Sequence, residues 1–306
     1  MDGSAGFPDS ILRRPLVLSY NRAFGSDDPA NVVDCAGAAE LTSDRACLRR
    51  AAAVVFHIPT LSGIELPPKH RGQKWVAWSM ESEVNYPELA DPGFMRNFEI
   101  TMTYRRGATV WFPYFDSATA AALCTPPSAK SESSPLVYFR SSQVDQCGRT
   151  AFAAELMRRV KIDSYGRVLR NRNLTVPDAG RETLLMVMAR YKFGLALENS
   201  VVEDYVSEKF FDALIAGAVP VYRGAPNISD FAPGDRCFID ASDFTNATGL
   251  AAYLYWLNGN SEAYDEYHAW RQRGLRPEFR ALVESVREPP FRRLCRLLRP
   301  IGPSGG

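Results

Sequence analysis

Short runs rich in apolar, β-branched and aromatic residues recur along this chain and constrain its fold more than any other feature. Four lie in the first half, at Leu16–Tyr20, Ala53–Ile58, Lys74–Ser79 and Thr109–Pro113. Runs of this length and composition predict buried strands, and the spacings between them leave room for crossover connections. A parallel α/β sheet is therefore expected in this part of the chain.

A polar segment, Thr125–Pro135 (TPPSAKSESSP), separates these runs from a second series. It is rich in Pro and Ser and shows no hydrophobic periodicity, which predicts a linker. After it we expect strands and helices at Leu136–Arg140 (strand), Thr150–Val160 (helix), Ile162–Tyr165 (strand), Phe193–Leu197 (strand), about Tyr205 to Ala216 (helix), Val219–Tyr222 (strand) and Thr248–Leu257 (helix). Two such series predict an α/β fold of two Rossmann-like halves that face each other.

The composition excludes some classes of partner. The 306 residues include 36 Lys and Arg against 35 Asp and Glu, so the net charge gives no general attraction to nucleic acid or to an anionic membrane. The longest apolar runs, Ala51–Phe56 and Leu184–Ala189, are too short to span a bilayer. The N-terminus lacks the basic start and apolar core of a signal peptide. We expect no nucleic-acid partner and no membrane segment or anchor in this sequence.

The cysteines and glycosylation sequons bear on the compartment. Six widely spaced cysteines, without a C-x-x-C pair or a neighbouring histidine, argue against a zinc site and permit disulfides, and a pairing of Cys35 with Cys295 stays open. Sequons at Asn173, Asn227 and Asn246 favour a secretory-pathway lumen. The absence of a targeting segment points the other way, so the residues alone leave the compartment undecided.

A dinucleotide-dependent oxidoreductase is the structural competitor for this fold class. Such an enzyme carries G-x-G-x-x-G directly after an early strand, because the glycines let the backbone approach a pyrophosphate. Here Leu16–Tyr20 is followed by NRAFGS, which contains one glycine. The sequence therefore argues against this class.

The segment Asp204–Gly217 predicts an amphipathic helix, with Asp204 as its N-cap and Gly217 as its terminator. Glu208 suits the positive end of the helix, whereas the macrodipole disfavours a lysine such as Lys209 there. A bound diphosphate would explain this lysine, because free amide groups and a cation together hold such an anion. The alternatives are a solvated surface lysine, and a Glu208 that only starts the helix rather than binding ribose hydroxyls.

The stretch 191–233 resembles the donor-binding motif of the α1,3/4-fucosyltransferases. The shared landmarks are Glu198–Ser200, Asp204–Lys209 and Ala216–Val221, and within the central hexapeptide only Ser207 departs from the usual Thr. Further blocks resemble the same family, so that about residues 50–245 are covered; these blocks are Gln73–Ser82, Thr103–Pro113 and Ile162–Asn173.

The resemblance implies a GT-B architecture, with two Rossmann-like domains and the active site in the cleft between them. It also implies GDP-fucose as the donor, an inverting transfer, no tightly bound cofactor and no essential divalent metal. The chain contains no Asp-x-Asp pair of the kind that metal-dependent transferases use. A glycan or glycoprotein acceptor and a Golgi location are expected on the same ground.

Glu81 is the predicted catalytic base. It follows the strand Lys74–Ser79, at the carboxyl end where open α/β sheets place ligand-binding groups. An inverting transfer needs one group to take the acceptor proton, and the family counterpart of Glu81, in a Glu-Ser-Pro block, is the proposed base. This chain has Glu83 in place of that proline, which either acts on Glu81 by like-charge repulsion or points away. Without the resemblance, Glu81 would be an ordinary loop carboxylate.

The remaining predicted site residues bind the nucleotide sugar. Arg170, within the basic stretch Arg167–Arg172, is the expected partner of the diphosphate because a guanidinium binds phosphate oxygens in pairs, although the cluster could be a solvated loop. Asn199 and Tyr205 are expected to line the same pocket, the alternatives being a turn-forming Asn and a core Tyr. His57 matches a histidine position of the family and is either structural or acceptor-binding.

We therefore predict an inverting, GDP-fucose-dependent α1,3-fucosyltransferase that acts on a GlcNAc hydroxyl of a glycan, with a weak preference for the N-glycan core. The predicted domains are residues 1–135 for the acceptor, residues 136–280 for GDP-fucose, and residues 281–306 as a tail packing back on the first domain. Two alternatives stay open: a transferase for another nucleotide sugar, and a glycan-binding protein on this fold without turnover.

Overall fold

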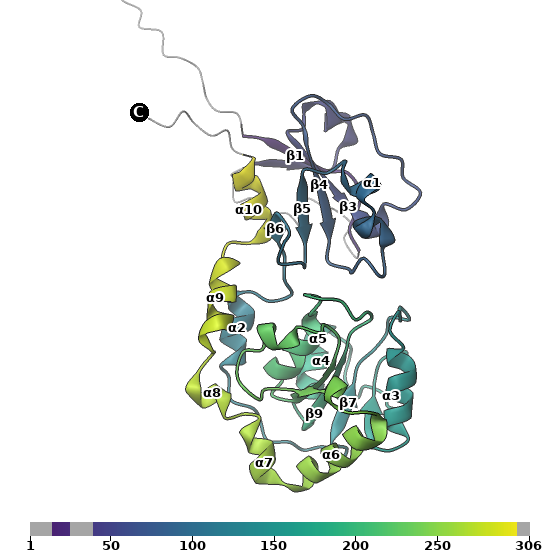
Figure 1. Cartoon of the computed structure of the whole chain (residues 1–306), viewed down its shortest axis with the longest axis vertical. Helices are drawn as coiled ribbons and strands as arrows, with labels where there is room; N and C mark the ends of the chain where they lie inside the picture. The colour runs from purple at the N-terminus through teal and green to yellow at the C-terminus, as the bar shows by residue number, and fades with distance from the viewer. Residues whose placement is uncertain (1–13, 25–38, 299–306) are drawn as a thin grey trace, which may run out of the picture.

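The computed structural model describes residues 14–24 and 39–298, which form two sheet-containing halves stacked end to end (Figure 1). The first sheet has the order β2-β1-β3-β4-β5-β6 and the second the order β11-β10-β9-β7-β8. All pairings between these strands are parallel. The predicted GT-B architecture of two facing Rossmann-like halves is confirmed.

The strands of the first sheet are β1 (Leu16–Ser19), β2 (Glu40–Thr42), β3 (Ala53–His57), β4 (Lys74–Ser79), β5 (Ile100–Thr103) and β6 (Val110–Trp111). Those of the second are β7 (Leu136–Tyr138), β8 (Ile162–Ser164), β9 (Phe193–Leu197), β10 (Val219–Arg223) and β11 (Ile239–Asp240). The α-helices are α1 (Pro92–Met95), α2 (Ser117–Leu123), α3 (Arg149–Met157), α4 (Arg181–Met188), α5 (Glu208–Ile215), α6 (Ala247–Gly259), α7 (Ser261–Glu266), α8 (Trp270–Arg273), α9 (Pro277–Ser285) and α10 (Pro290–Leu297).

The predicted runs became strands wherever they were long and apolar. Strands β4 and β9 have the predicted bounds, and the other predicted strands differ only at their ends. Three short strands, β2, β5 and β11, were not predicted, because two to four residues carry too little pattern to distinguish a strand from a loop.

The two faces of the first sheet are buried in different ways. Successive residues of a strand point to opposite faces, so Val54 of β3 lies in one core cluster and Val55 in another. One face packs against the short α1 and its neighbouring loops, through residues such as Phe94. The other face packs against Phe291 and Leu294 of α10, at the far end of the chain. The first half therefore needs the last helix to complete its core.

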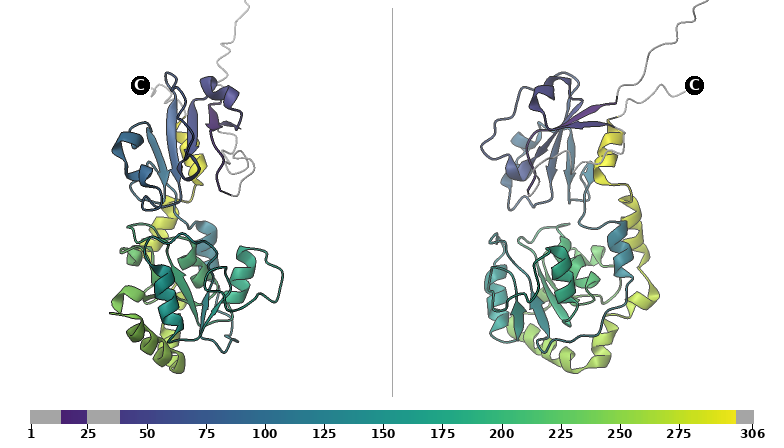
Figure 2. Two further views of the ribbon diagram at one scale, coloured as in Figure 1. Left: turned by 90° about the vertical axis from the view of Figure 1, so that its right-hand side faces the viewer. Right: turned by 180° about the vertical axis from the view of Figure 1, so that it is seen from behind.

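The chain passes between the halves twice, as the view from behind shows (Figure 2). The first passage follows β6 and leads into α2, which packs against α5 and α9 of the second half. The second passage runs through α7, α8 and α9 to α10, along one side of the molecule, and α10 contacts β6. Two parallel connections restrict how far the halves can move apart.

Some sequence expectations concern single features of this fold. None of the helices among the described residues is long and apolar enough to cross a membrane. Of the three sequons, Asn173 is exposed and Asn246 caps α6 through its side-chain oxygen. The Nδ2 atom of Asn227 donates to Asp204 at 2.9 Å. The possible pairing of Cys35 with Cys295 falls on Cys35, which lies outside the described residues.

Replacement of Phe291 by Ala should destabilise the first half. The Phe291 ring is buried against Trp78 and Phe112, with ring centroids 5.2 Å and 6.2 Å away. Loss of a buried Phe costs about 3–5 kcal/mol of unfolding free energy. Urea unfolding monitored by tryptophan fluorescence measures the loss. Leu297→Ala on the exposed side of the same helix is the control, with an expected change of less than about 0.5 kcal/mol. Equal losses in the two variants would contradict this packing.

Candidate active site

The backbone around Glu81 is fixed at the end of β4. The buried Ser79 side chain accepts a hydrogen bond from the Glu81 amide at 3.0 Å and donates to the Glu81 carbonyl at 2.9 Å. The hydroxyl of Tyr114 donates to the Met80 carbonyl at 2.5 Å. Strand β4 ends here because its last side chain bonds to the backbone of the following turn rather than extending the ladder.

The Glu81 carboxylate is held by residues of both halves. Its Oε2 atom accepts hydrogen bonds from the Tyr205 hydroxyl at 3.0 Å, Asn199 Nδ2 at 3.2 Å and Asn85 Nδ2 at 3.3 Å. Tyr205 and Asn199 belong to the second half, whereas Asn85 follows Glu81 in the first. The Oε1 atom accepts no hydrogen bond from the described residues. One oxygen is thus fixed and the other stays available for chemistry.

Tyr205 is a permanent hydrogen-bond donor in this arrangement. Its side chain is 1% exposed, and its ring packs edge-on against Tyr104 with centroids 4.9 Å apart. Burial, together with the neighbouring Tyr114, Glu198 and Glu81, raises the pKa of Tyr205 far above its usual value. The phenol therefore stays protonated, and its proton points to the carboxylate.

The start of α5 differs from the prediction. The helix begins at Glu208, and its N-cap is Ser207, whose side chain accepts from the Lys209 amide. The prediction of Asp204 as N-cap is wrong. Asp204 instead adopts a left-handed backbone with φ of 65°, and its carboxylate accepts from the Arg106 side chain at 2.8 Å. Arg106, from the other half, thus binds the Asp204 carboxylate, which is then not available to cap the helix.

Lys209 lies at the helix start as predicted, but its partner is a protein carboxylate. Its ammonium group lies 2.8 Å from Ser207 Oγ, 3.0 Å from Glu208 Oε1 and 3.5 Å from Glu198 Oε2. Burial alone would lower the pKa of Lys209, but the carboxylates of Glu198 and Glu208 outweigh it and raise that pKa. These carboxylates explain the position of the lysine without a bound anion, and its binding to a diphosphate stays a prediction.

Five of the six predicted site residues line one cavity of about 360 Å³ between the halves. They are Glu81, Asn199, Tyr205, Glu208 and Lys209. A second cavity of about 740 Å³ adjoins it, because Tyr114 and Glu208 line both. Each of the two spaces has a volume within the range that small-molecule sites in proteins usually show.

The sixth residue, Arg170, does not line this cavity. It is exposed on the loop after β8, and the arginines that line the cavity are Arg140 and Arg149. Arg170 was predicted because its loop is rich in basic residues. The arginines that line the cavity come instead from the segment after β7 and from the start of α3. Of these two, Arg149 carried a usable signal, because the macrodipole disfavours an arginine at a helix start just as it does Lys209.

The two cavity arginines are anchored by the loop between β7 and α3. Arg149 is 2% exposed and donates to the Leu197 carbonyl at 2.8 Å and the Val144 carbonyl at 2.7 Å, while its buried Nε has no partner among the described residues. The Asp145 carboxylate, from the loop before the N-cap Gly148, accepts from the Arg149 amide at 2.9 Å and the Thr150 amide at 2.8 Å. The first amides of α3 are therefore occupied, and an anion would meet the guanidinium groups.

Glu83, which replaces the family proline, points away from Glu81. Its carboxylate accepts hydrogen bonds from the Tyr104 hydroxyl and pairs with Arg105. Burial would raise the pKa of Glu83, but these two donors lower it. Of the two alternatives left by the sequence, the structure favours the one in which Glu83 does not act on Glu81.

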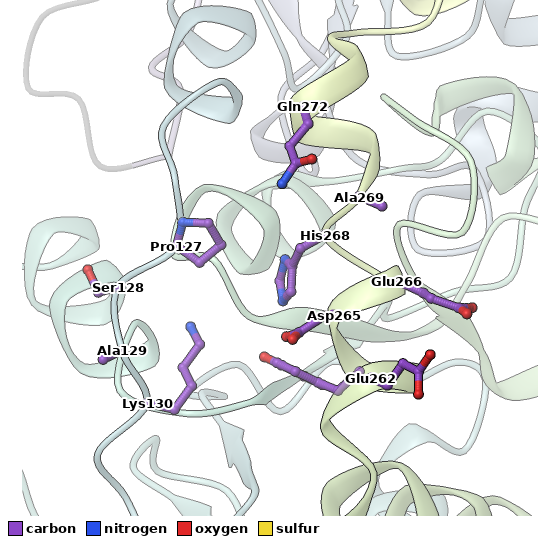
Figure 3. Close-up of a pocket in the computed structure, with 11 residues that line it drawn as sticks. Pro127, Ser128, Ala129, Lys130, Glu262, Asp265, Glu266, His268, Ala269 and Gln272 are labelled. Atoms are coloured by element: carbon purple, nitrogen blue, oxygen red, sulfur yellow. The ribbon is translucent and has the colours of Figure 1, made fainter.

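A further cavity, of about 640 Å³, lies between the linker and helices α7 and α8 (Figure 3). Lys130 and His268 both reach into it. The lysine ammonium donates to the carbonyls of Ala189 at 3.0 Å and Gly217 at 2.6 Å, directly after α4 and α5. A cation that neutralises two helix C-termini has a structural role. This cavity shares no lining residue with the one at Glu81, so we do not assign the site to it.

His57 behaves as a structural residue. It is 4% exposed at the end of β3, its Nδ1 lies 2.9 Å from Thr60 Oγ1, and its ring packs against Trp78 with centroids 4.9 Å apart. Burial lowers the pKa of His57 to about 4. Among the described residues, no group of His, Cys, Asp and Glu is arranged to hold a metal ion.

Replacement of His57 by Gln should change how stability depends on pH. Because the folded-state pKa of His57 is about 4 and the unfolded value is 6.5, the unfolded chain binds more protons between these values. The contribution of His57 to the free energy of unfolding is present above pH 6.5. It is lost as pH falls, by about 2–3 kcal/mol at pH 4. Urea unfolding from pH 7 to pH 4 should show a smaller decline for His57→Gln than for the wild type. Parallel declines would contradict the buried neutral histidine.

The sequence matches two family descriptions over most of its length. Residues 12–115 match "Fucosyltransferase, N-terminal" and residues 129–302 match "Glycosyltransferase family 10 (fucosyltransferase) C-term". The chain is 31% identical over 247 residues to alpha-(1,3)-fucosyltransferase B of Drosophila melanogaster, which covers 74% of this chain and 55% of the relative. It is 30% identical over 221 residues to GDP-fucose protein O-fucosyltransferase 3 of Homo sapiens, covering 68% of this chain and 46% of the relative. The chain thus spans about half the length of these relatives.

The fold is also similar to solved structures. An alpha1,3-fucosyltransferase crystal structure aligns with a TM-score of 0.57 at 16% identity, covering 85% of this chain and 82% of that one. A structure of an alpha1,3-fucosyltransferase with GDP-fucose aligns with a TM-score of 0.56, also at 16% identity, over 86% and 84%. At this identity the similarity establishes the fold. The sequence matches on both halves show that the chain belongs to glycosyltransferase family 10, the fucosyltransferases.

Proposed function

We propose that this chain transfers fucose from GDP-fucose to an acceptor hydroxyl, with residues 1–135 binding the acceptor and residues 136–280 the donor. Residues 281–306 are the predicted tail, of which residues 281–298 are described, and α10 in this part packs on the acceptor half. The observation that supports the proposal best is the single cavity where Glu81 of the first half meets Arg149 and Lys209 of the second. A carboxylate opposite the buried Arg149 and the half-buried Lys209 suits a displacement that takes up a proton on one side and releases a diphosphate on the other.

Glu81 acts as the general base in this proposal. The acceptor oxygen attacks C1 of fucose, the bond from C1 to the diphosphate oxygen breaks, and the acceptor proton passes to Glu81. Its Oε1 atom is the oxygen available for the proton, because Oε2 already accepts three hydrogen bonds. Donors on Oε2 hold the carboxylate in place before the acceptor arrives, which is how a positioned base gains rate.

The departing diphosphate is stabilised by the arginines rather than by Lys209 alone. The charge of Lys209 is already balanced by the fully buried Glu198. Arg149 carries a buried Nε that has no partner among the described residues, and its guanidinium lines the cavity. Guanidinium groups in a buried site bind phosphate oxygens with charge-assisted hydrogen bonds. We therefore assign the diphosphate to Arg149 with Arg140, and a supporting role to Lys209.

The nucleoside would extend along Glu208 into the adjoining cavity. Glu208 is the carboxylate that lines both spaces, and it lies exposed at the start of α5. An ionised carboxylate only accepts hydrogen bonds, so it suits the two hydroxyls of a ribose. The absence of a tightly bound cofactor and the dispensability of a divalent metal stay predictions of the family resemblance.

For the acceptor we propose a GlcNAc hydroxyl of a glycan and an α1,3 linkage, in the Golgi lumen as part of protein glycosylation. The similarity to the Drosophila alpha-(1,3)-fucosyltransferase B supports this choice. A second candidate acceptor is a protein hydroxyl. The similar identity to the human GDP-fucose protein O-fucosyltransferase 3 favours it.

The variants Glu81→Gln and Arg149→Met should separate catalysis from donor binding. Glu81→Gln keeps the shape of the side chain and removes the base, so fucose transfer should fall about 10²–10⁴-fold. Its affinity for GDP-fucose should stay within about threefold, because no donor to the diphosphate is lost. Arg149→Met should weaken that affinity about 10- to 100-fold by removing charge-assisted hydrogen bonds. Calorimetric titration measures the affinity for GDP-fucose, and the release of GDP in the presence of acceptor measures the rate of fucose transfer. Near-normal fucose transfer by Glu81→Gln would refute the assignment of Glu81 as the general base.

Incubation of the wild type with GDP-fucose and three acceptors tests the acceptor class. The acceptors are a chitobiose-core N-glycan, an N-acetyllactosamine and a folded protein domain without glycans. We expect fucose on O3 of GlcNAc, established by linkage analysis of the product. Fucose found only on the protein would support the second candidate instead. Transfer from another nucleotide sugar but not from GDP-fucose would refute the donor, and donor binding without transfer to any acceptor would favour a non-catalytic protein.

A further inference from the structure

We propose that Asn85 is a positioning residue that holds the Glu81 carboxylate and the amide of Asn199 in one arrangement. The inference rests on the proposed function, because it concerns the base of that reaction. The Nδ2 group of Asn85 donates to Glu81 Oε2 at 3.3 Å and to Asn199 Oδ1 at 2.9 Å. It thereby links a residue of the first half to one of the second half at the reacting carboxylate.

Backbone hydrogen bonds of a tight turn hold Asn85 in place, in addition to the contacts of its side chain. The amides of Asn85 and Tyr86 donate to the Ser82 carbonyl at 3.0 Å and 3.1 Å, which folds the chain back into a tight turn beside Glu81. This turn is joined to the second half through the hydroxyls of Ser82 and Ser200, which lie 2.6 Å apart and are both fully buried. A substitution at Asn85 therefore changes the polar contacts while the turn itself keeps its other supports.

Electrostatics determine which way the Asn85 amide points. In the observed orientation its NH₂ group faces two oxygens, whereas a flipped amide would place Oδ1 against Glu81 Oε2 and Asn199 Oδ1. Three acceptors without a donor between them repel one another, so only the observed orientation is favourable. The Oδ1 atom of Asn85 is buried and has no partner among the described residues.

The orientation of Asn85 in turn determines that of Asn199. The Asn199 Oδ1 atom accepts from Asn85 and from the Ser200 hydroxyl at 3.1 Å, which leaves its NH₂ group to donate to Glu81 at 3.2 Å. Without Asn85, the Asn199 amide loses one of the two donors that keep its NH₂ group toward the base. Asn85 thus supports Glu81 directly and through Asn199.

The variants Asn85→Asp and Asn85→Ala test this role. Asp nearly keeps the shape of Asn but turns a carboxylate toward Glu81, whereas Ala only removes the donor. We expect kcat for fucose transfer to fall about 10- to 100-fold in Asn85→Ala, from the loss of hydrogen bonds to a charged group, and further in Asn85→Asp. The KM for GDP-fucose should stay within about threefold, since the groups assigned to the diphosphate and the ribose, Arg149, Arg140 and Glu208, are not changed. In Asn85→Asp the acidic limb of the pH–rate profile should move to higher pH, because a second carboxylate opposes ionisation of the base.

The matched control is Asn97→Asp. Asn97 is a half-buried asparagine of the same half, and its Nδ2 donates to the Phe94 carbonyl at 2.7 Å, away from Glu81. This control should change kcat less than about threefold and leave the shape of the pH–rate profile unaltered, as expected for a site with no contact to the base. A packing role for Asn85 would make the isosteric Asp variant milder than the Ala variant, which is the opposite of the expected order.

If the Asn85→Asp variant fails to fold, a double variant tests the same role. In this double variant, Asn85→Ala is combined with Glu81→Gln. If Asn85 acts through Glu81, the rate of fucose transfer by the double variant should lie within about twofold of the rate of Glu81→Gln alone. An equal loss in both backgrounds would overturn the inference, as would an Asn85→Asp variant as active as Asn97→Asp. In both cases an active wild type leaves the proposed function standing. A wild type that transfers no fucose from GDP-fucose to any acceptor would overturn the function and this inference together.

Discussion

The site depends on one carboxylate oxygen that accepts hydrogen bonds from both halves of the molecule. Glu81 Oε2 is bound by Tyr205 and Asn199 from the second half and by Asn85 from the first. Two of the three donors that hold this proposed base therefore come from the opposite half of the molecule. Tyr205 and Asn199 also line the cavity, so the same two residues hold the proposed base and line the proposed donor site.

Other contacts near the cavity hold this closed arrangement. Arg106 of the first half pairs with Asp204 and Asp230 of the second, at 2.8 Å and 2.7 Å. Asp204 adopts a left-handed backbone there, a conformation that costs free energy for a residue other than glycine and persists only where surrounding contacts compensate. The chain also crosses between the halves twice, and α10 completes the core of the first sheet. The fold and the site thus share the same interdomain contacts.

The sequence alone predicted those parts that local pattern and position determine. Strand β4 is a long apolar run, and Glu81, two residues after its end, lies where parallel sheets place functional groups. The helix that carries Glu208 and Lys209 was predicted from its amphipathic pattern and its terminal glycine. Five of the six predicted residues consequently lie together in the structure.

The remainder depended on contacts that no local pattern contains. Asp204 is a good N-cap by type, but Arg106, 98 residues earlier, takes its carboxylate, so Ser207 caps the helix. Lys209 was assigned a bound anion, whereas the buried Glu198 already supplies a negative charge. Arg170 was chosen for its basic neighbourhood, while Arg149 reaches the cavity because its side chain is anchored on the Leu197 carbonyl. Pairings across the fold decide such roles.

The most direct test of this account is a crystal structure of the chain with GDP-fucose bound. The account predicts the diphosphate within hydrogen-bonding distance of Arg149, with the Tyr205 hydroxyl still on Oε2 of Glu81 and Oε1 facing the sugar. A nucleotide bound in the cavity beside Lys130, or a Tyr205 side chain that has left Glu81 in the complex, would contradict it.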